Sequence, residues 1–358
     1  MKLRTIAALL ASALTSLGAG AVGSVDLTTY QLIGRYNLPE PTRTLSAPAN
    51  NFLTQEASGV AWSRDTNTLF IVGDGSRSIT QVSLTGQLIN TMTLALEAGK
   101  PQGTAFYDTE GIAWAGGSNF VIVEERLRVA NLVTFAAGTT LAYSGAQRVK
   151  LGTTIGNIGL EGISYDPKTG GFIVVKEKNS AQTAPGGVFQ TSINFAAGTA
   201  SNGSASTIES INLFDLNKPG GVNSAVTDLT EVFALSNVTT SGSADYDNIL
   251  LMSQESGRVL KVNRSGDILG TLDIPFLPSS PNGTTTLTGA GGALSLADQQ
   301  HEGMTMDDRG YLYIVNENAG GDINYPQLWV FAPVPEPETY AMLLAGLALV
   351  GWRRRAAR

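Results

Sequence analysis

The stretch that decides the fold is residues 108–125, which read DTEGIAWAGGSNFVIVEE. It holds a small acidic motif, a short apolar run, a turn at Gly116-Gly117 and a second apolar run that ends in two glutamates. Two short apolar runs joined by a glycine turn predict a β-hairpin whose strands are buried on both faces. The same pattern recurs along the chain, so this hairpin is one copy of a repeated unit.

The pattern returns four more times, three times clearly and once weakly. The clear copies read EASGVAWSRDTNTLFIVGD at 56–74, LEGISYDPKTGGFIVVKE at 160–177 and HEGMTMDDRGYLYIVNE at 301–317. The weak copy has Thr230-Glu231 where the others have Ser-Gly or Glu-Gly. Internal repetition at intervals of roughly 50 residues is typical of propellers and other repeat folds.

A third and a fourth strand follow the better copies, as at 79–94, and residues 258–274 repeat that hairpin after the weak copy. Four antiparallel strands per unit are typical of a propeller blade, so we predict an all-β fold, a five-bladed β-propeller. The last copy offers only one more strand, 328–331, while 30–38 forms an unassigned strand. Pairing these two would close the ring with the N-terminal strand and remove an open edge. A β-sandwich or two smaller β domains is the rival architecture, but neither predicts one motif five times.

The composition agrees with a globular β protein and excludes several classes of function. Of the 358 residues, 42% are hydrophobic and 41 are glycines. Segments 180–208 and 277–292 are rich in small and polar residues and are predicted to be surface loops. The formal charge of -7 disfavours a nucleic-acid binder, which would present a basic face. The absence of cysteine excludes disulfides and thiolate metal sites, and the single histidine excludes a multi-histidine centre.

The N-terminus is predicted to be a secretory signal peptide, residues 1–21. Lys2 and Arg4 precede an apolar run, and the small residues that end at Ala21 are those that signal peptidase requires. A buried N-terminal helix is the alternative, although no amphipathic pattern supports it. The domain that remains after cleavage is expected to be the propeller, residues 22–333.

The C-terminus, residues 334–358, is predicted to be a sorting or anchor segment. Val334-Pro335-Glu336-Pro337 leads into an apolar stretch and then into an arginine cluster. The stretch of about 13 apolar residues reaches about 20 Å as a helix, short of a bilayer core of roughly 30 Å. The arginines should stay cytoplasmic, which leaves the body of the chain on the far side of the inner membrane.

The order of Pro-Glu-Pro, a short apolar helix and terminal arginines resembles the PEP-CTERM sorting signal of Gram-negative bacteria. The resemblance implies that an exosortase processes the tail after transient anchoring in the membrane. The protein would then be released or transferred to the cell envelope, the extracellular space or an exopolysaccharide matrix. A plain C-terminal membrane anchor is the alternative.

Acidic residues occupy matching places in the repeats. In an antiparallel hairpin the second strand ends beside the start of the first. Acidic residues that follow the motif by 15 or 16 positions should therefore lie beside the motif. If the first strands line the central channel, carboxylates from separate blades meet at one mouth. We predict that the core of this cluster is Glu110, Glu161 and Glu302. Further candidates, as ligands or as neighbours of ligands, are Glu56, Asp74, Asp228, Glu125, Glu177 and Glu317.

Such a convergence of carboxylates favours a bound cation, because like charges at close range repel one another or raise one another's pKa. A hard divalent ion with oxygen ligands is the natural counterion. Calcium (Ca2+) tolerates six to eight irregular ligands, whereas magnesium prefers a tighter octahedron. The alternative is that each glutamate bonds the backbone of the neighbouring blade as a repeated staple, and the two roles can coexist.

Other conspicuous side chains are predicted to be structural. His301, beside Glu302, suggests a general base, yet a lone histidine in a strand is more often an ordinary hydrogen-bonded residue. Trp62, Trp114 and Tyr165 recur on the first strands and indicate packing within blades rather than a platform for sugars. No nucleophile elbow, phosphate loop or zinc motif is present in the sequence.

The repeat text over about residues 30–332 resembles the family of SdiA-regulated proteins. The motifs that carry the likeness are Glu56-Ala57-Ser58-Gly59, Asp74, Glu110-Gly111-Ile112, Val123-Glu124-Glu125-Arg126, Glu161-Gly162-Ile163, Lys176-Glu177-Lys178, Ser253-Gln254-Glu255-Ser256 and Glu302-Gly303-Met304-Thr305. The resemblance implies a five-bladed propeller with a bound calcium ion, and the family has no established reaction. The departure at Thr230-Glu231 puts the part of the fourth blade in any site in doubt.

Two functions compete at this point. The first is an exported calcium-binding propeller that acts as a binding or structural module of the envelope or the extracellular matrix. The second is a calcium-dependent hydrolase of the phosphoesterase or lactonase type, in which the same carboxylates hold the metal and activate water. The sequence shows no separate acid–base pair outside the repeat, which favours the binding module.

Overall fold

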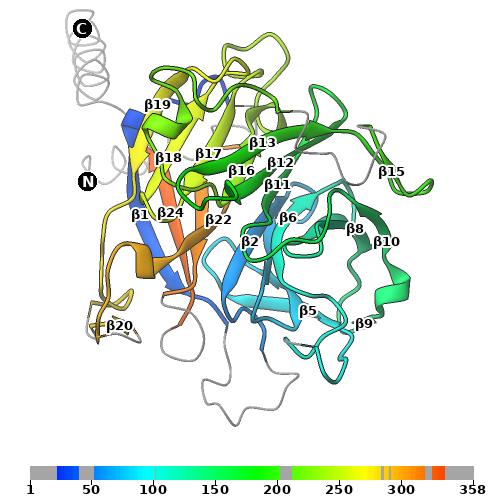
Figure 1. Ribbon diagram of the computed structural model, residues 1–358. Helices are drawn as coiled ribbons and strands as arrows, with labels where there is room; N and C mark the ends of the chain where they lie inside the picture. The colour runs from blue at the N-terminus through cyan, green and yellow to red at the C-terminus, as the bar shows by residue number, and fades with distance from the viewer. Residues whose placement is uncertain are drawn as a thin grey trace, which may run out of the picture.

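Five antiparallel sheets surround a common axis in the computed structural model of the protein (Figure 1). The structure describes residues 22–39, 52–100, 102–201, 212–283, 286–289, 292–318 and 325–334. The five inner strands contact one another in a closed ring, in the order β2, β6, β11, β16, β22 and back to β2. The predicted five-bladed β-propeller is therefore confirmed.

Within each blade the strands lie side by side from the axis outward. Blade 1 consists of β2 (Ala57–Ser63), β3 (Thr68–Gly73), β4 (Ser78–Val82) and β5 (Leu88–Leu94), and blade 2 consists of β6 (Thr109–Trp114), β7 (Asn119–Glu124), β8 (Val129–Thr134) and β10 (Gln147–Lys150). Blade 3 consists of β11 (Leu160–Asp166), β12 (Gly171–Lys178) and β13 (Pro185–Thr191), and blade 4 consists of β16 (Glu231–Ala234), β17 (Ile249–Ser253), β18 (Arg258–Val262) and β19 (Ile268–Asp273). Blade 5 consists of β22 (His301–Met306), β23 (Leu312–Asn316), β24 (Gln327–Pro333) and β1 (Tyr30–Asn37).

Short elements complete the described fold. β9 (Thr140–Leu141) adds to β5 in parallel, and two small hairpins pair β14 (Ile193–Asn194) with β15 (Thr199–Ala200) and β20 (Thr288–Gly289) with β21 (Gly292–Ala293). Helical structure in these ranges is limited to 3-10 turns, namely η1 (Leu27–Thr29), η2 (Tyr143–Gly145), η4 (Val222–Ser224), η5 (Leu235–Asn237) and η6 (Ala297–Gln299).

The N-terminal strand closes the ring, as predicted. β1 pairs antiparallel with β24, with Tyr30 opposite Pro333 and Asn37 opposite Gln327. The last blade thus combines three strands from the end of the domain with one from its beginning. This pairing covers the edge of β24 that the missing fourth strand would leave open.

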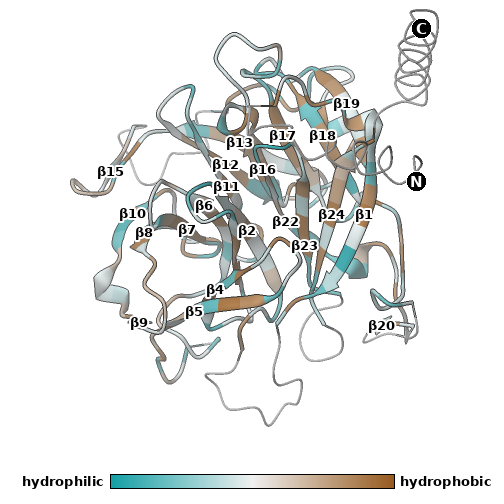
Figure 2. Ribbon diagram, turned by 180° about the vertical axis from the view of Figure 1, so that it is seen from behind, coloured by the Kyte–Doolittle hydropathy of each residue, from teal (hydrophilic) through white to brown (hydrophobic). Residues whose placement is uncertain are grey.

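Apolar side chains fill the spaces between neighbouring blades. In β7, Phe120 and Ile122 face blade 1, whereas Val121 and Val123 face blade 3. Each strand therefore contributes to two cores, because successive side chains point to opposite faces. This explains why the strands are continuous apolar runs, which Figure 2 shows in brown along the sheets.

The third blade departs from the prediction. Segment 180–208 was expected to be a surface loop, but it contains β13, which pairs with β12 along most of its length, and the hairpin of β14 and β15. The sheet of this blade has three strands, and Asn212 forms an isolated bridge with Phe189 at its outer edge. Small residues such as Gly186 and Gly187 concealed the strand from a hydropathy pattern.

Candidate metal centre

Four of the five inner strands carry a β-bulge at the acidic motif. In β6 the pairing with β7 shifts register between Thr109 and Ile112, which places Glu110 and Gly111 in the bulge. The same irregularity falls at the motif in β2, β11 and β22. A bulge bends its strand and re-aims a side chain, so Glu110 faces the mouth of the channel.

The glycine after the carboxylate is required by the close approach of neighbouring inner strands. A Cβ atom at Gly111 would lie 2.4 Å from the carbonyl oxygen of Glu161, and one at Gly59 would lie 2.4 Å from that of Glu110. Any larger residue would push the blades apart. This glycine therefore reflects packing around the axis rather than ligand chemistry.

In four of the five blades the second strand of the hairpin brings another carboxylate to the same mouth, and in blade 4 it brings Gln254. In blade 2 the N–H of Glu125 donates to the carbonyl oxygen of Asp108 over 2.8 Å. In blade 5 the N–H of Glu317 donates to the carbonyl oxygen of Gln300 over 3.1 Å. The end of the second strand is thus tied to the residue that precedes the first, as the hairpin geometry predicts.

These residues surround a hollow of about 350 Å³ whose lining is almost entirely polar. Eight of the nine carboxylates predicted from the sequence line it, and the remaining lining residues are amides. The carboxylates are Glu56, Asp74, Glu110, Glu125, Glu161, Glu177, Glu302 and Glu317, and the amides are Asn157, Gln254 and Gln300.

Asp228 is the one predicted residue that does not line the hollow. Its carboxylate accepts hydrogen bonds from the hydroxyl of Ser253 and from the N–H of Glu255, the latter over 3.4 Å. The fourth inner strand begins only at Glu231 and pairs with β17 without a register shift. Without the bulge, Asp228 stabilises the end of the hairpin instead of facing the channel.

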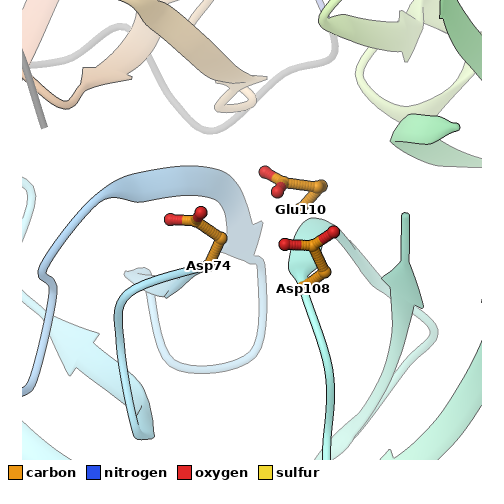
Figure 3. Close-up of side chains that lie close together, drawn as sticks. All are labelled: Asp74, Asp108 and Glu110. Carbon is orange, nitrogen blue, oxygen red and sulfur yellow. The ribbon is translucent and has the colours of Figure 1, made fainter. Parts of the chain in front are cut away.

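Asp108 belongs to the site, although the sequence did not single it out. One oxygen each of Asp74, Asp108 and Glu110 lie within 4.8 Å of one another, and Figure 3 shows the three side chains gathered between blades 1 and 2. A second group with the same spacing consists of Glu125, Glu161 and Glu177. The sequence did contain a signal for Asp108, because this residue occupies the place in its repeat that Glu56 occupies in the repeat of blade 1.

The environment of the hollow favours the neutral form of its carboxyls. Burial, with the charge of Glu56 next in size, raises the pKa of Asp74 to about 8. Burial likewise raises the pKa of Glu125 to about 8 and that of Glu177 to about 7. Burial and neighbouring carboxylates raise the pKa well above its usual value at Glu110, Glu161, Glu302 and Glu317.

Two basic side chains contact this cluster within the described ranges. Arg126 Nε lies 2.7 Å from Asp108 Oδ2 and 3.5 Å from Glu125 Oε2. Lys178 Nζ lies 3.8 Å from Glu177 Oε1, but only 2.6 Å from Glu255 Oε1 outside the hollow. The carboxylates thus outnumber the cations that the protein itself supplies.

Two glutamates do staple neighbouring blades. Glu125 Oε1 accepts a hydrogen bond from the N–H of Gly159 over 2.7 Å. Glu231, which the sequence analysis noted only as a departure, is fully buried and accepts backbone hydrogen bonds from Val232, Met304 and Ile163. A Cβ atom at Gly162 would lie 2.1 Å from Glu231 Oε1. The fourth blade therefore places its carboxylate between the third and the fifth blades, where Gly162 leaves room for it.

The aromatic residues of the first strands, Trp62, Trp114 and Tyr165, pack against the apolar cores as predicted, and the three also line a second pocket together. Trp62 is buried and its indole N–H donates to Asn67 Oδ1, while that of Trp114 donates to the carbonyl oxygen of Gly117. Both partners lie in the turn of the same hairpin. His301 is fully buried and packs edge-on against Trp329, and it does not line the hollow.

Remote structural likenesses accompany this fold. A glutaminyl cyclase from Myxococcus xanthus has 13% identity and a TM-score of 0.43, with 85% of this chain and 95% of that one covered. A luciferin-regenerating enzyme has 11% identity and a TM-score of 0.42, with 83% and 94% covered. A gluconolactonase from Xanthomonas campestris has 14% identity and a TM-score of 0.39, with 85% and 99% covered.

The C-terminal residues 333–355 match the PEP-CTERM protein-sorting motif. The motif implies export, processing by an exosortase and sorting to the cell surface. The signal peptide and the C-terminal apolar helix predicted from the sequence lie outside the described residues. Within those residues, no helix combines the length and the apolar character needed to span a membrane.

The body of the chain has a family match of its own, over residues 37–319. That range covers every blade motif from Glu56 to Glu317, and the architecture is the five-bladed propeller that the motifs predict. By this match, which spans most of its length, the chain belongs to the SdiA-regulated family.

Proposed function

We propose that this exported propeller binds calcium in the acidic hollow and acts as a binding or structural module of the cell envelope or the extracellular matrix. The observation that carries the proposal is the convergence of carboxylates from four blades on one hollow. Glu110, Glu161 and Glu302 form the core of the proposed site. An ion that contacts several blades would hold the ring together at its axis.

Two features of the hollow fit a cation. Glu110 is only 9% exposed, and its carboxylate accepts no hydrogen bond from the residues that the structure describes. Asp74 Oδ1 is buried and likewise accepts none within those ranges. A buried carboxylate oxygen without a donor is costly unless a positive charge faces it.

The donor set favours calcium over magnesium. The hollow offers carboxylates and the amide oxygens of Gln254 and Gln300, spread irregularly over all five blades, whereas Asn157 Oδ1 accepts from the guanidinium of Arg126. Calcium accepts six to eight oxygen ligands in flexible geometry, whereas magnesium requires a tight octahedron and gives up water reluctantly. Calcium bound here would neutralise part of the repulsion among the carboxylates, and no redox chemistry is required of it.

Replacing Glu161 with Gln tests the core of the site. An ion that binds only the folded state adds about 2.7 kcal/mol at a hundredfold excess over its Kd. Wild-type protein should therefore melt at a higher temperature in calcium than in magnesium, and Glu161→Gln should weaken this response. The metal-free variant should be as stable as the metal-free wild type or slightly more so, because one repelling charge is gone.

Glu97→Gln is the matched control, since it removes an equal charge at an exposed position beside Lys100. It should keep the full response to calcium. If calorimetry detects no calcium binding and Glu161→Gln merely destabilises the protein, the carboxylates are staples between blades and the proposed metal site is wrong.

A calcium-dependent hydrolase is the competing function, and substrates distinguish it. Phosphoesters, esters and lactones should be tested with and without calcium. A binding module turns over none of them. Turnover that requires calcium and disappears in Glu110→Gln would establish the enzyme instead.

The proposed export has its own test. Signal peptidase would cleave after Ala21, and an exosortase would process residues 334–358. β24 ends at Pro333, and the N–H of Val334 donates to the carbonyl oxygen of Thr29, so a chain that ends at Val334 keeps the whole sheet. This truncated chain should fold and be secreted without retention at the membrane. Loss of folding, or continued retention, would contradict the proposed boundary.

A further inference from the structure

We infer that the face of the propeller opposite the acidic hollow lies against the bilayer while the tail anchors the chain, so that the hollow opens away from the membrane. The inference rests on the proposed anchoring by residues 334–358 and extends it from the tail to the whole domain. We call this surface the pocket face. It consists of the pocket that Trp62, Trp114 and Tyr165 line and of the hairpin turns that follow the inner strands.

The register of blade 5 directs the end of the domain toward the pocket face. In β22, Glu302 lines the hollow and Met306 lines the pocket, so the two ends of this strand mark the two faces. Met306 pairs with Leu312 in β23, and Leu312 pairs with Phe331 in β24. β24 therefore runs toward the pocket face and ends there at Pro333.

The tail has a short connection to the bilayer. The N–H of Val334 donates to the carbonyl oxygen of Thr29 over 2.9 Å, which fixes the point where the tail leaves the domain. The apolar stretch begins at Tyr340, so residues 335–339 form the whole connection. Five residues span at most about 18 Å. The seven residues of β24 are about 23 Å long, so the connection is too short to pass beside the domain and bring the hollow to the bilayer.

The N-terminal end of the domain lies on the same face. The N–H of Val22 donates to the carbonyl oxygen of Val238 over 2.9 Å, shortly after the inner strand β16 ends at Ala234. A Cβ atom at Gly310, in the turn after β22, would lie 3.5 Å from Val22 Cγ2. The residue that follows the proposed cleavage site is thus on the pocket face, so both ends of the domain lead to one surface.

The two mouths of the channel differ in charge as a bilayer with anionic lipid requires. Eight carboxylates line the hollow, whereas Arg64 is the one charged residue that lines the pocket. Arg64 is exposed, stands over the ring of Trp62 and donates to the carbonyl oxygen of Asn237 over 2.7 Å. It forms no ion pair within the described ranges. Anionic lipid attracts such an arginine and repels carboxylates, and Trp and Tyr favour the interface of membrane and water.

The simplest rival role for the pocket is to hold a small ligand. Its volume is about 40 Å³, whereas a cavity that holds benzene measures roughly 150 Å³. The indole N–H groups of Trp62 and Trp114 donate within their own hairpins. The hydroxyl of Ser164 donates to the carbonyl oxygen of Tyr165 and accepts from the N–H of Ala234. The pocket therefore has little room for a ligand, and these polar groups already have partners.

Fluorescent labels on single cysteines measure the orientation, because the natural chain has no cysteine. Ser118→Cys places a label on the pocket face, in the turn after Trp114, and Ala181→Cys places one at the opposite end, in the turn after Lys178. Both positions are exposed. Blade 2 does not adjoin blade 5 in the ring, so the label at Ser118 approaches the bilayer only if the whole face does.

The labelled chain, residues 22–358, is bound to vesicles of phosphatidylethanolamine and phosphatidylglycerol that contain a lipid with a nitroxide on its headgroup. We expect the chain to float with the vesicles in a density gradient. The nitroxide should quench the Ser118→Cys label and leave the Ala181→Cys label unchanged. The chain that ends at Val334 should neither float nor be quenched.

A pair of charge reversals tests the contribution of the surface itself. Arg64→Glu should reduce the quenching of the Ser118→Cys label without loss of flotation, because the tail is intact. Lys150→Glu makes the same change in charge at an exposed position near the hollow end of blade 2. This control should leave the quenching unchanged.

Equal quenching of the two labels, or stronger quenching of the Ala181→Cys label, overturns the inference and leaves the proposed anchoring intact. Flotation without quenching of either label also overturns it, because the domain then stands away from the bilayer. A chain 22–358 that does not float contradicts the proposed anchoring, and the inference with it. Flotation thus tells the two failures apart.

Discussion

His301 is the single histidine of the chain, and its two ring nitrogens are buried without a hydrogen-bond partner among the described residues. Burial, aided by the charge of Arg35, lowers its pKa to about 3. Below pH 6.5 the imidazole of His301 is protonated in the unfolded chain but stays neutral in the folded chain. His301 should therefore cost the folded state about 1.4 kcal/mol for each pH unit between 6.5 and 3.

Replacing His301 with Phe should remove this loss and keep the edge-on contact with Trp329. Thermal melts of both proteins at pH 7, 5.5 and 4 provide the measurement. The difference between the two melting temperatures at each pH reports on His301 alone, because both proteins have the same carboxyl groups. We expect the melting temperature of the variant to rise relative to that of the wild type as the pH falls. Parallel curves of melting temperature against pH would show that His301 does not titrate on unfolding.

Single residues also mark where the sequence was informative about the site and where it was not. Eight of the nine predicted carboxylates face the hollow because strand period and hairpin return determine their direction. Asp108 was missed although it occupies the position that Glu56 has in blade 1, and both residues have a left-handed backbone, with φ at 61° and 51°. Glu231 was missed because two of its three partners are backbone N–H groups of other blades, which no local pattern reveals.

At the scale of elements, the bulge and the glycine of four of the five inner strands set the spacing of the blades. Gly111→Ala would place a methyl group 2.4 Å from the carbonyl oxygen of Glu161. Relief of this overlap should lower the free energy of unfolding by about 1–3 kcal/mol. The midpoint of chemical denaturation measures the effect.

Gly156→Ala is the matched control, because no atom lies within 4 Å of the position that its Cβ would occupy. Its effect should stay within about 0.5 kcal/mol. Equal effects of the two substitutions would mean that glycine is needed for reasons other than the approach of the strands.

The closing strand β1 permits a second prediction at this scale. Deleting residues 22–38 removes the only strand in the described fold that pairs with the outer edge of β24. The exposed edge should cause self-association and a lower melting temperature. Size-exclusion chromatography with light scattering checks this against the protein that begins at residue 22. A shortened protein that remains monomeric and melts unchanged would mean that closure contributes no stability.

Elements with strong apolar character were the ones that the sequence predicted well. β3, β7, β12 and β23 are apolar runs buried against two neighbouring blades, so their pattern and their surroundings agree. β13 was predicted as part of a loop because Pro185, Gly186 and Gly187 begin it. Its place is determined by pairing with β12, a tertiary contact that overrides local preference.

At the scale of the whole molecule, the acidic hollow should make stability depend on pH and calcium together. Asp74 and Glu125, with pKa values of about 8, keep protons in the folded state that the unfolded chain releases near pH 4. The metal-free protein should therefore lose stability as the pH rises from 4.5 to 8. Calcium takes the place of these protons, so its stabilising effect should grow over the same interval.

Melting temperatures at pH 6 and pH 8.5, with calcium and with a chelator, measure this coupling. We expect the increase caused by calcium to be larger at pH 8.5. The same increase at both values would indicate that the ion binds away from the buried carboxylates, for example among exposed acidic side chains.

The pairing of β1 with β24 also constrains the order in which the molecule can fold. These strands lie at opposite ends of the domain, and contacts of such large sequence separation form late. The blades can form one after another, but the ring stays open until residues 327–333 are available to pair with β1. A chain that is cut short before β24 would therefore carry folded blades without a closed ring.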